Sequence, residues 1–269
     1  MNMTNSRTPI RGAVVVGLLA IAPALLLAQG GRGRGAQPPR SPKEAAPIDL
    51  TGYWVSLVTE DWRWRMVTPL KGDSASVPIN QAAKKIVNEW DPAKDEAAGQ
   101  QCKSYGAAAI MRVPGRVHIT WDDDNTLKVE TDAGTQTRIL HFGGAPPANL
   151  QPSLQGYSAA RWEPGQTVPQ SSIPLGLGPR VGVRTRSLEV TTTNLSPGYL
   201  RKNGVPYSAK TTVTEYFDRF TEPDGAERFM VMTIVTDPDY LAVPFVTTSD
   251  FKKEADGSKW DPTPCSSTQ

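Results

Sequence analysis

Short segments in which apolar and polar side chains alternate run through most of the chain, and they restrict its fold more than any other feature. Side chains of an extended strand point alternately to the two faces of a sheet, so a period of two is typical of half-buried strands. Clusters of Pro, Gly, Asp and Asn separate the segments, as turns would. The pattern predicts an all-β protein whose antiparallel meander closes into a β-barrel, with one or two short helices. The expected strands cover residues 52–60, 107–113, 116–121, 127–131, 135–142, 156–163, 187–193, 211–220 and 228–236, with a further one at 245–253.

One stretch has helical rather than strand spacing. Apolar side chains recur at helical intervals from Ala83 to Trp90, and Asn80 stands where an N-cap residue would. We expect this helix to end before Pro92 and to pack over an open end of the barrel. Residues 164–186 are rich in Pro and Gly and show little periodicity. They predict a long loop between two strands.

The hairpin formed by residues 116–131 can be assigned a register. We expect Trp121 to pair with Leu127, because that register sets apolar residues opposite one another along one face. It also sets His118 opposite Glu130 on the other face. A shift by one residue would pair apolar with polar side chains throughout.

The register of the next strand determines whether the two histidines could bind the same metal ion. A three-residue turn at 132–134 would direct Thr137, Ile139 and His141 to the apolar side. His118 and His141 would then lie on opposite faces of the sheet. A metal site needs several converging His, Cys or carboxylate ligands. The sequence therefore predicts no metal site, and it contains no motif that implies a cofactor.

The N-terminus has the three parts of a secretory signal peptide over residues 1–30. Arg7 and Arg11 precede an apolar run, and small residues follow it, with cleavage after either Ala28 or Gly30. The run is shorter than the roughly 20 residues that a membrane-crossing helix needs, so an uncleaved anchor is the less favoured alternative. We expect a periplasmic or secreted protein that meets the membrane only transiently, through its signal peptide.

Composition divides the rest of the chain into a leader and one domain. Residues 31–47 are rich in Gly, Arg, Pro and Gln and predict a disordered leader. Residues 48–269 are within the size range of a single all-β domain. The chain has 29 basic and 27 acidic side chains, so loss of Arg7 and Arg11 leaves 27 of each. A protein without net charge lacks the basic surface that nucleic acid or an anionic membrane would require.

The two cysteines, Cys102 and Cys265, would reach an oxidising compartment on export. We therefore expect a disulfide between them. It would close a loop of about 160 residues, for which the chain-entropy model gives on the order of 4 to 5 kcal/mol. The alternative is a nucleophilic or metal-binding thiol, but no histidine cluster lies near either cysteine in the sequence.

The densest group of aromatic and guanidinium side chains lies at residues 59–65. In an extended strand, Trp62 and Trp64 would face one side and Arg63 and Arg65 the other. Such a surface can bind a ligand by ring stacking, cation–π contact and bidentate hydrogen bonds to an anion. The structural alternative is that the tryptophans plug one end of the core and the arginines pair with the acids just before them.

A charged pair is expected inside the barrel. Glu215 should lie mid-strand on the inner face, and Arg219 follows on the same side. A buried carboxylate beside a guanidinium can serve as a general acid or base, and it can equally be a structural ion pair. The chain has no Gly-x-Ser-x-Gly elbow, phosphate-binding glycine loop or HExxH motif.

Five short segments follow one another at residues 156–163, 188–192, 206–208, 214–217, and 236–238 with 244–245. They resemble, in the same order, the blocks G-x-S-x-G-x-W-E-G-D, L-V-V-x-T, H-S, T-E-R and D-P of a family of uncharacterised secreted bacterial proteins. The chain departs from the pattern by a long insertion after Glu163 and by Tyr207 where a His is usual. The resemblance implies export and β architecture, and it implies no reaction.

The triplet Gly52-Tyr53-Trp54 resembles the G-x-W near the first strand of lipocalin-like barrels. In those proteins the tryptophan closes the barrel base and the interior holds a small apolar ligand. This similarity implies a lipocalin-like barrel.

The leading functional hypothesis is therefore an exported barrel that binds a small, partly apolar or aromatic molecule in its interior. The residues expected to contact that molecule are Trp62, Trp64, Arg65, Glu215 and Arg219. A barrel-cavity enzyme, such as an isomerase, cyclase or hydrolase, is one alternative and would use Glu215 as its acid or base. An envelope interaction module, recognisable by an apolar patch outside the barrel, is another.

Overall fold

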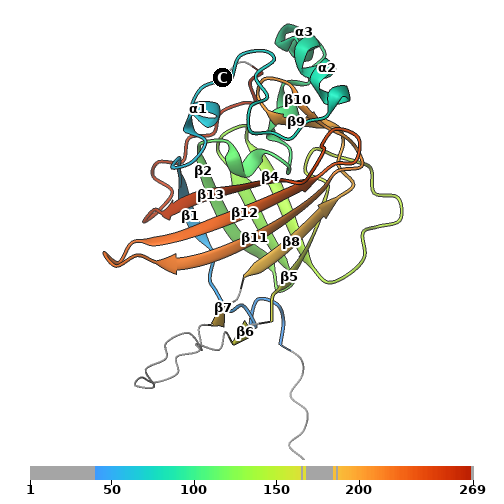
Figure 1. Cartoon of the computed structure of the whole chain (residues 1–269). Helices are drawn as coiled ribbons and strands as arrows, with labels where there is room; N and C mark the ends of the chain where they lie inside the picture. Colours follow the sequence, from blue (N-terminus) through green and yellow to red (C-terminus); the bar gives the residue numbers. More distant parts are fainter. Residues whose placement is uncertain (1–39, 165, 168–183, 186, 268–269) are drawn as a thin grey trace, which may run out of the picture. The chain divides into compact units, whose positions relative to one another are not determined.

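The computed structural model describes residues 40–164, 166–167, 184–185 and 187–267 (Figure 1). The predicted signal peptide and residues 31–39 of the predicted leader lie outside the described residues. Most of the predicted loop at 164–186 also lies outside them. Within the described ranges, no helix is long and apolar enough to cross a membrane.

Nine strands close into a barrel in the order β1-β13-β12-β11-β8-β5-β4-β3-β2. Neighbouring strands are antiparallel except β4 and β5, which run parallel and interrupt the meander. The all-β barrel predicted from the alternating pattern is confirmed. Its strands are β1 (Gly52–Leu57), β2 (Arg116–Asp123), β3 (Thr126–Thr131), β4 (Gln136–Phe142), β5 (Tyr157–Trp162), β8 (Leu188–Thr193), β11 (Thr212–Thr221), β12 (Glu227–Thr236) and β13 (Phe245–Lys253).

The predicted register of the first hairpin is confirmed. Trp121 pairs with Leu127, and His118 lies opposite Glu130. The His118 Nδ1 and a Glu130 carboxylate oxygen are 3.3 Å apart. Alternation along β2 and β3 therefore directs the aliphatic side chains inward and the polar pairs outward, as the sequence indicates.

The predicted register of β4 is wrong. Thr131 pairs with Gln136, so the turn contains one residue more than expected. Gly134 and Thr135 both adopt positive φ, at 76° and 48°, which accommodates the extra residue. A shift by one residue exchanges the two faces of a strand. His141 consequently points outward, as His118 does, while Arg138 and other residues of the opposite parity face the interior.

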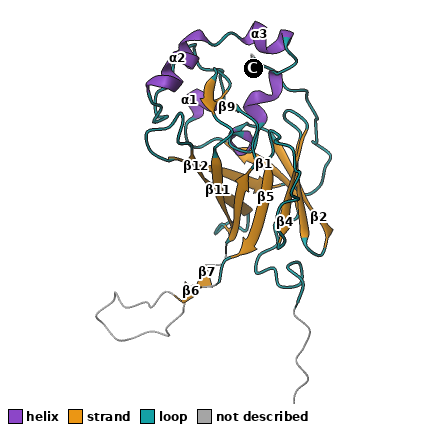
Figure 2. Ribbon diagram, turned by 90° about the vertical axis from the view of Figure 1, so that its right-hand side faces the viewer, coloured by secondary structure: helices purple, strands orange, loops and turns teal. Residues whose placement is uncertain are grey.

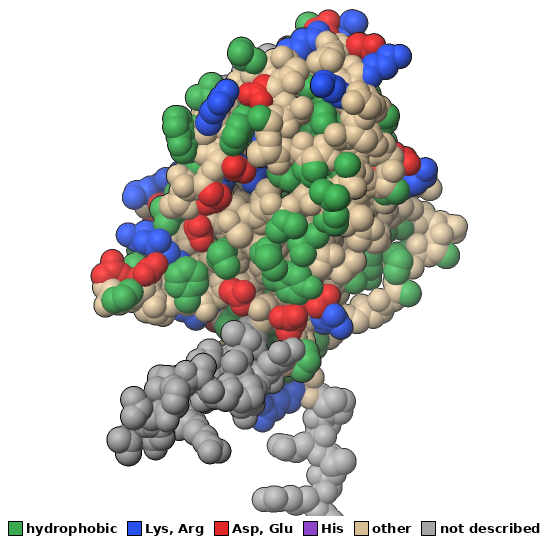
Figure 3. Space-filling model, viewed as in Figure 1, with side chains coloured by type: hydrophobic (Ala, Val, Ile, Leu, Met, Phe, Trp, Pro, Cys, Tyr) green, Lys and Arg blue, Asp and Glu red, His purple; other side chains and the backbone are tan. Residues whose placement is uncertain are grey.

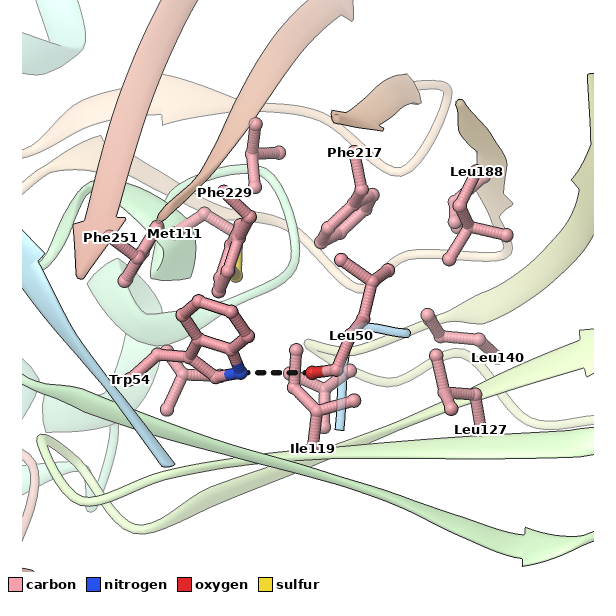
Figure 4. Close-up of a cluster of buried hydrophobic side chains, with 14 of the residues drawn as sticks. Leu50, Trp54, Met111, Ile119, Leu127, Leu140, Leu188, Phe217, Phe229 and Phe251 are labelled. Atoms are coloured by element: carbon pink, nitrogen blue, oxygen red, sulfur yellow. Dashed lines mark hydrogen bonds between the residues drawn. The ribbon is translucent and has the colours of Figure 1, made fainter. Parts of the chain in front are cut away.

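Aromatic and aliphatic side chains fill the barrel interior (Figure 4). The indole nitrogen of Trp54 donates a hydrogen bond of 2.9 Å to the carbonyl of Leu50. The Phe229 ring stacks on Phe251 at 4.5 Å and meets the edge of Trp54 at 4.8 Å. The buried members of this barrel core include Leu50, Trp54, Ile110, Met111, Ile119, Leu127, Leu140, Leu188, Phe217, Phe229 and Phe251.

A second layer covers one end of the barrel, where the helices gather (Figure 2). The oxygen of the Asn80 side chain accepts a hydrogen bond of 3.0 Å from the Ala83 amide, which confirms the predicted N-cap. A separate buried cluster, with Val87, Leu200 and Tyr207 among its members, packs this layer together. Its elements are α1 (Trp62–Arg65), α2 (Gln81–Glu89), α3 (Pro92–Ala97), β9 (Gly198–Arg201) and β10 (Val205–Tyr207).

The strand predicted at 107–113 is absent from the described structure. The segment instead contains the 3-10 turn η2 (Ile110–Arg112), and a first 3-10 turn, η1 (Gln101–Tyr105), precedes it. Ile110 belongs to the barrel core, whereas Ala107 belongs to the cluster of the covering layer. The segment is thus buried on both sides, and its apolar run carries no alternation that could distinguish a strand from a compact turn.

The predicted disulfide between Cys102 and Cys265 is confirmed, with their Cα atoms 5.0 Å apart. It ties η1 to the C-terminal residues, 163 positions away. The Thr263 amide also donates a hydrogen bond of 2.9 Å to the Asp132 carbonyl. The C-terminal segment is therefore held at two places.

Residues 40–47, which the composition assigns to a disordered leader, instead contact the other end of the barrel. The Trp162 indole nitrogen donates a hydrogen bond of 2.8 Å to the Pro42 carbonyl. The Lys43 amide donates one of 3.2 Å to the Asp124 carbonyl. The predicted long loop contains two short paired strands, β6 (Gln166–Thr167) and β7 (Arg184–Thr185).

Candidate anion-binding site

Three arginines from distant parts of the chain line one pocket at the covered end of the barrel. They are Arg65 of α1, Arg112 of η2 and Arg201 of β9. Trp64 and Lys202 also contribute to the lining. The pocket has a volume of about 40 Å³ that the centres of water molecules can occupy. This is enough for a few waters or for one small polar group.

All three guanidinium groups belong to buried residues. Arg65 is 8% exposed, Arg112 is 6% exposed and Arg201 is 4% exposed. A charged side chain removed from water is costly unless partners compensate it. The partners of each arginine therefore decide what this pocket can bind.

Arg65 and Arg112 are each paired with an acid. An Nη of Arg65 forms an ion pair with the Glu60 carboxylate, and its Nε donates a hydrogen bond of 2.9 Å to the Arg112 carbonyl. The Nη2 of Arg112 donates a hydrogen bond of 2.8 Å to the Asp61 carboxylate. These two positive charges are therefore neutralised nearby.

Arg201 is held by neutral groups. It donates hydrogen bonds of 2.7 Å to the Ala75 carbonyl and 2.8 Å to the Ser76 hydroxyl. Its guanidinium carbon lies 4.9 Å from the centroid of the Trp64 ring. Among the ion pairs of the described residues none involves Arg201, and the nearby Asp73 is 3.6 Å from Arg63. Asp61 and Asp73 act on Arg201 only at longer range, and Lys202 adds a further positive charge to the lining, so the pocket keeps a net positive charge.

Each of the three guanidinium groups has one nitrogen without a hydrogen-bond partner in the described structure. These atoms are Nη2 of Arg65, Nη1 of Arg112 and Nε of Arg201. Burial, together with the charge of Arg112, lowers the pKa of Arg201 to about 10. Burial also lowers the pKa of Arg65, while Glu60 opposes that effect. Arg201 still carries its proton at pH 7, so the pocket offers several charged donors to an anion.

The expected extended strand at Trp62 to Arg65 is wrong, because these residues form the short helix α1. Asp61 adopts a left-handed conformation with φ of 52°, and its carbonyl accepts hydrogen bonds from the amides of Trp64 and Arg65. Trp62 and Trp64 therefore do not share a face. Trp64 turns toward the pocket, whereas Trp62 is exposed.

Glu215 lies inside the barrel and away from this pocket. It forms a bidentate pair with Arg138, with distances of 3.1 and 2.6 Å between nitrogen and oxygen. Both side chains are within the filled interior. Arg219 is ion-paired with Glu227. Glu215 has no exposed surface, so the accessible cavity that an acid or base role requires is not found around it.

The buried carboxylate of Asp237 differs from the pocket arginines, because several donors of the protein bind its oxygens. It accepts hydrogen bonds from the amide and hydroxyl of Ser208 and from the hydroxyl of Thr211. The amides of Asp239 and Tyr240 also donate to it. Because these donors already use its oxygens, Asp237 stabilises the turn after β12 and has little capacity for a ligand.

The sequence indicated only part of the arginine site. Trp64 and Arg65 stand out by composition, but Arg112 and Arg201 were not singled out. Arg112 ends an apolar run, Ala-Ala-Ala-Ile-Met, and Arg201 follows Tyr-Leu. A lone arginine in a segment apolar enough to be buried is a signal that could have marked both. Among the described residues there is no group of three His, Cys, Asp or Glu side chains suited to a metal ion.

Comparison with protein families finds no match for the chain. Comparison with curated proteins and with solved structures finds none either. The assignment of a function therefore depends on the geometry of the site.

Proposed function

We propose that this chain is an exported barrel protein that binds a small anion of single negative charge in the pocket of Arg65, Arg112 and Arg201. The observation that carries the proposal is that three arginines line one pocket and that each has a buried guanidinium nitrogen without a hydrogen-bond partner. A carboxylate, a sulfate ester or a phosphodiester has this charge and several acceptor oxygens.

The energetic argument follows from burial. Leaving a buried donor without a partner costs about 1–3 kcal/mol, and more for a charged group. An anion in the pocket would accept hydrogen bonds from these donors and would neutralise the charge of Arg201. Since Glu60 and Asp61 already neutralise Arg65 and Arg112, Arg201 and Lys202 are the lining charges left for a ligand. The negative charge of Asp73 also acts on Arg201, which favours a singly charged anion over a doubly charged one.

The proposed ligand lies in a different place from the one that the sequence-based hypothesis predicts. That hypothesis put a partly apolar molecule inside the barrel, where the aromatic and aliphatic core now leaves little room. Trp64 and Arg65 belong to both versions of the site. Trp62, Glu215 and Arg219 do not line the pocket.

Export is the second part of the proposal. It is supported by the pattern of residues 1–30 and is compatible with the disulfide, since such bonds persist in oxidising compartments. Mass spectrometry of the protein recovered from the periplasm or medium should find an N-terminus at Gln29 or Gly31. An N-terminus that retains the apolar run would count against export by this route.

The binding proposal is tested by calorimetric titration of the exported protein with acetate, methyl sulfate and dimethyl phosphate at constant ionic strength. We expect saturable binding of at least one of them. Arg201→Gln should weaken binding at least tenfold, and Arg201→Lys should restore only part of it, because lysine keeps the charge but lacks the forked donors.

A matched control is available on β5. The side chain of Arg161 is largely exposed, pairs with Glu189 and does not line the pocket, so Arg161→Gln should leave the affinity unchanged. Circular dichroism verifies that each variant is folded. Equal affinities of the wild type and a folded Arg201→Gln variant would refute this site, as would no binding of any of the three anions.

A further inference from the structure

Four large apolar side chains beside the arginine pocket are exposed to solvent. We call this set the apolar strip. Their exposed fractions are 65% for Trp62, 59% for Met66, 64% for Val67 and 81% for Leu70. In the space-filling view, hydrophobic and basic side chains lie next to one another over α1 (Figure 3). Such a concentration of exposed apolar surface often marks a contact site.

The apolar strip is continuous with the pocket. Val67 belongs to the strip and also lines the pocket. The Met66 amide donates a hydrogen bond of 2.9 Å to the Trp62 carbonyl, so these two residues are one helical turn apart and share a side. Leu70 follows Pro69, which lines the pocket as well. A molecule that leaves the pocket on this side would meet the strip.

Hydrogen bonds fix the backbone that carries the strip. The Asn203 side chain donates hydrogen bonds of 2.9 and 2.8 Å to the carbonyls of Leu70 and Asp73. The Trp64 indole nitrogen donates one of 3.2 Å to the Asp73 carboxylate. The exposed positions are thus part of a well-connected segment, and not the tip of a loosely attached loop.

We infer that the anion bound by this pocket is the head of a single-chain amphiphile, with a carboxylate between the arginines and an apolar chain along the strip. The inference rests on the proposed function. It follows from the continuity of the pocket with the apolar strip, and a space of about 40 Å³ can hold only the head of such a molecule. The remainder must lie outside, where the adjoining surface is apolar.

The head must enter a pocket whose arginines are more than nine-tenths buried. A lipid embedded in a bilayer keeps its head at the membrane surface, and the pocket could take it only by extracting the lipid. The ligand class is therefore a free monomeric carboxylate, and not a membrane surface.

A chain-length series tests this inference. The exported protein is titrated calorimetrically with acetate, butanoate, hexanoate and octanoate, with methyl hexanoate as a neutral probe. Full burial of one methylene corresponds to about fourfold in affinity and half burial to about twofold. We expect affinity to rise about two- to fourfold per methylene, and methyl hexanoate to bind at least tenfold more weakly than hexanoate.

Variants of the strip separate the chain from the head. Leu70→Ser and Met66→Ser should flatten the dependence on chain length while acetate affinity stays unchanged. Val246→Ser is the matched control, because Val246 is exposed on β13 and is not part of the strip or the pocket. It should leave the whole series unchanged.

The outcomes distinguish the inference from the proposed function. If acetate and octanoate bind equally and both depend on Arg201, the anion site stands and the amphiphile is refuted. If no anion binds, both fail. If the protein binds vesicles of an anionic phospholipid but no free carboxylate, the assignment to a monomeric ligand is wrong.

Discussion

The guanidinium of Arg201 lies over the indole ring of Trp64, 4.9 Å from the ring centroid. Arg63 approaches the same ring at 5.4 Å, and the indole nitrogen donates a hydrogen bond to Asp73. Trp64 thereby connects the short helix α1 to the arginine that lacks an ion-pair partner. Any ligand that alters the environment of Arg201 also alters that of this indole.

Trp64 should therefore report binding. We expect an anion that saturates the pocket to change the intrinsic tryptophan fluorescence. Trp64→Phe should remove most of that change. The affinity measured by calorimetry should fall no more than about threefold in this variant, because phenylalanine keeps part of the cation–π contact. Trp260→Phe is the control, since Trp260 packs near Tyr53 and does not line the pocket. A fluorescence change that survives in Trp64→Phe would place the ligand elsewhere.

Anion affinity should be constant between pH 6 and 9. Burial lowers the pKa of Arg201 to about 10, so this group stays charged throughout that range and loses its proton only above it. Affinity should fall as the pH rises through about 10, because a neutral Arg201 no longer attracts the anion. Calorimetry with acetate at several pH values measures this. A decline centred near pH 7 would instead indicate a histidine or another group as the binding cation.

Loss of the disulfide should destabilise the protein and weaken the site. The bond spans 163 positions, for which the chain-entropy model gives an upper value of about 5 kcal/mol. Because it anchors the segment that leads to Arg112, a Cys102→Ser, Cys265→Ser double variant should also bind acetate more weakly. Urea unfolding and calorimetry measure the two effects. Unchanged affinity in a folded variant would show that η1 is positioned without the bond.

The buried pair of Arg138 and Glu215 should matter for stability alone. Glu215→Gln leaves a buried guanidinium without its counter-charge, which typically costs about 3–5 kcal/mol. The double replacement Arg138→Met, Glu215→Leu should restore much of that loss, since an apolar pair removes both buried charges. Anion affinity should be unchanged in the double variant. If the folded double variant lost anion binding, the functional site would lie in the barrel interior instead.

Much of the barrel is predictable because its strands carry a clear alternation. The pairing of Trp121 with Leu127 follows from that pattern, since one register alone buries the apolar face. The register of β4 does not, because it depends on whether Thr135 belongs to the turn or to the strand. Its positive φ of 48° is unusual for a threonine and leaves no signature in the pattern of polarity.

The arginine site is only partly predictable for a different reason. Trp64 and Arg65 are neighbours in the sequence, so their density is visible without a fold. Arg112 and Arg201 join them only through the 3-10 turns and the β9–β10 hairpin of the covering layer. The sequence pattern identified neither of these elements. Convergence of residues from such segments is a property of the tertiary structure.

The central claim is that Arg201 and its two neighbours hold an anion, and the hydrogen on the Nε of Arg201 tests it most directly. In a ¹⁵N-labelled sample this Nε–H signal can be assigned by its absence from Arg201→Lys. We predict that it moves downfield and saturates as acetate is added, because the unpartnered donor gains an acceptor. An Nε–H signal that remains unchanged up to tens of millimolar acetate, while other arginine signals respond, would contradict the account.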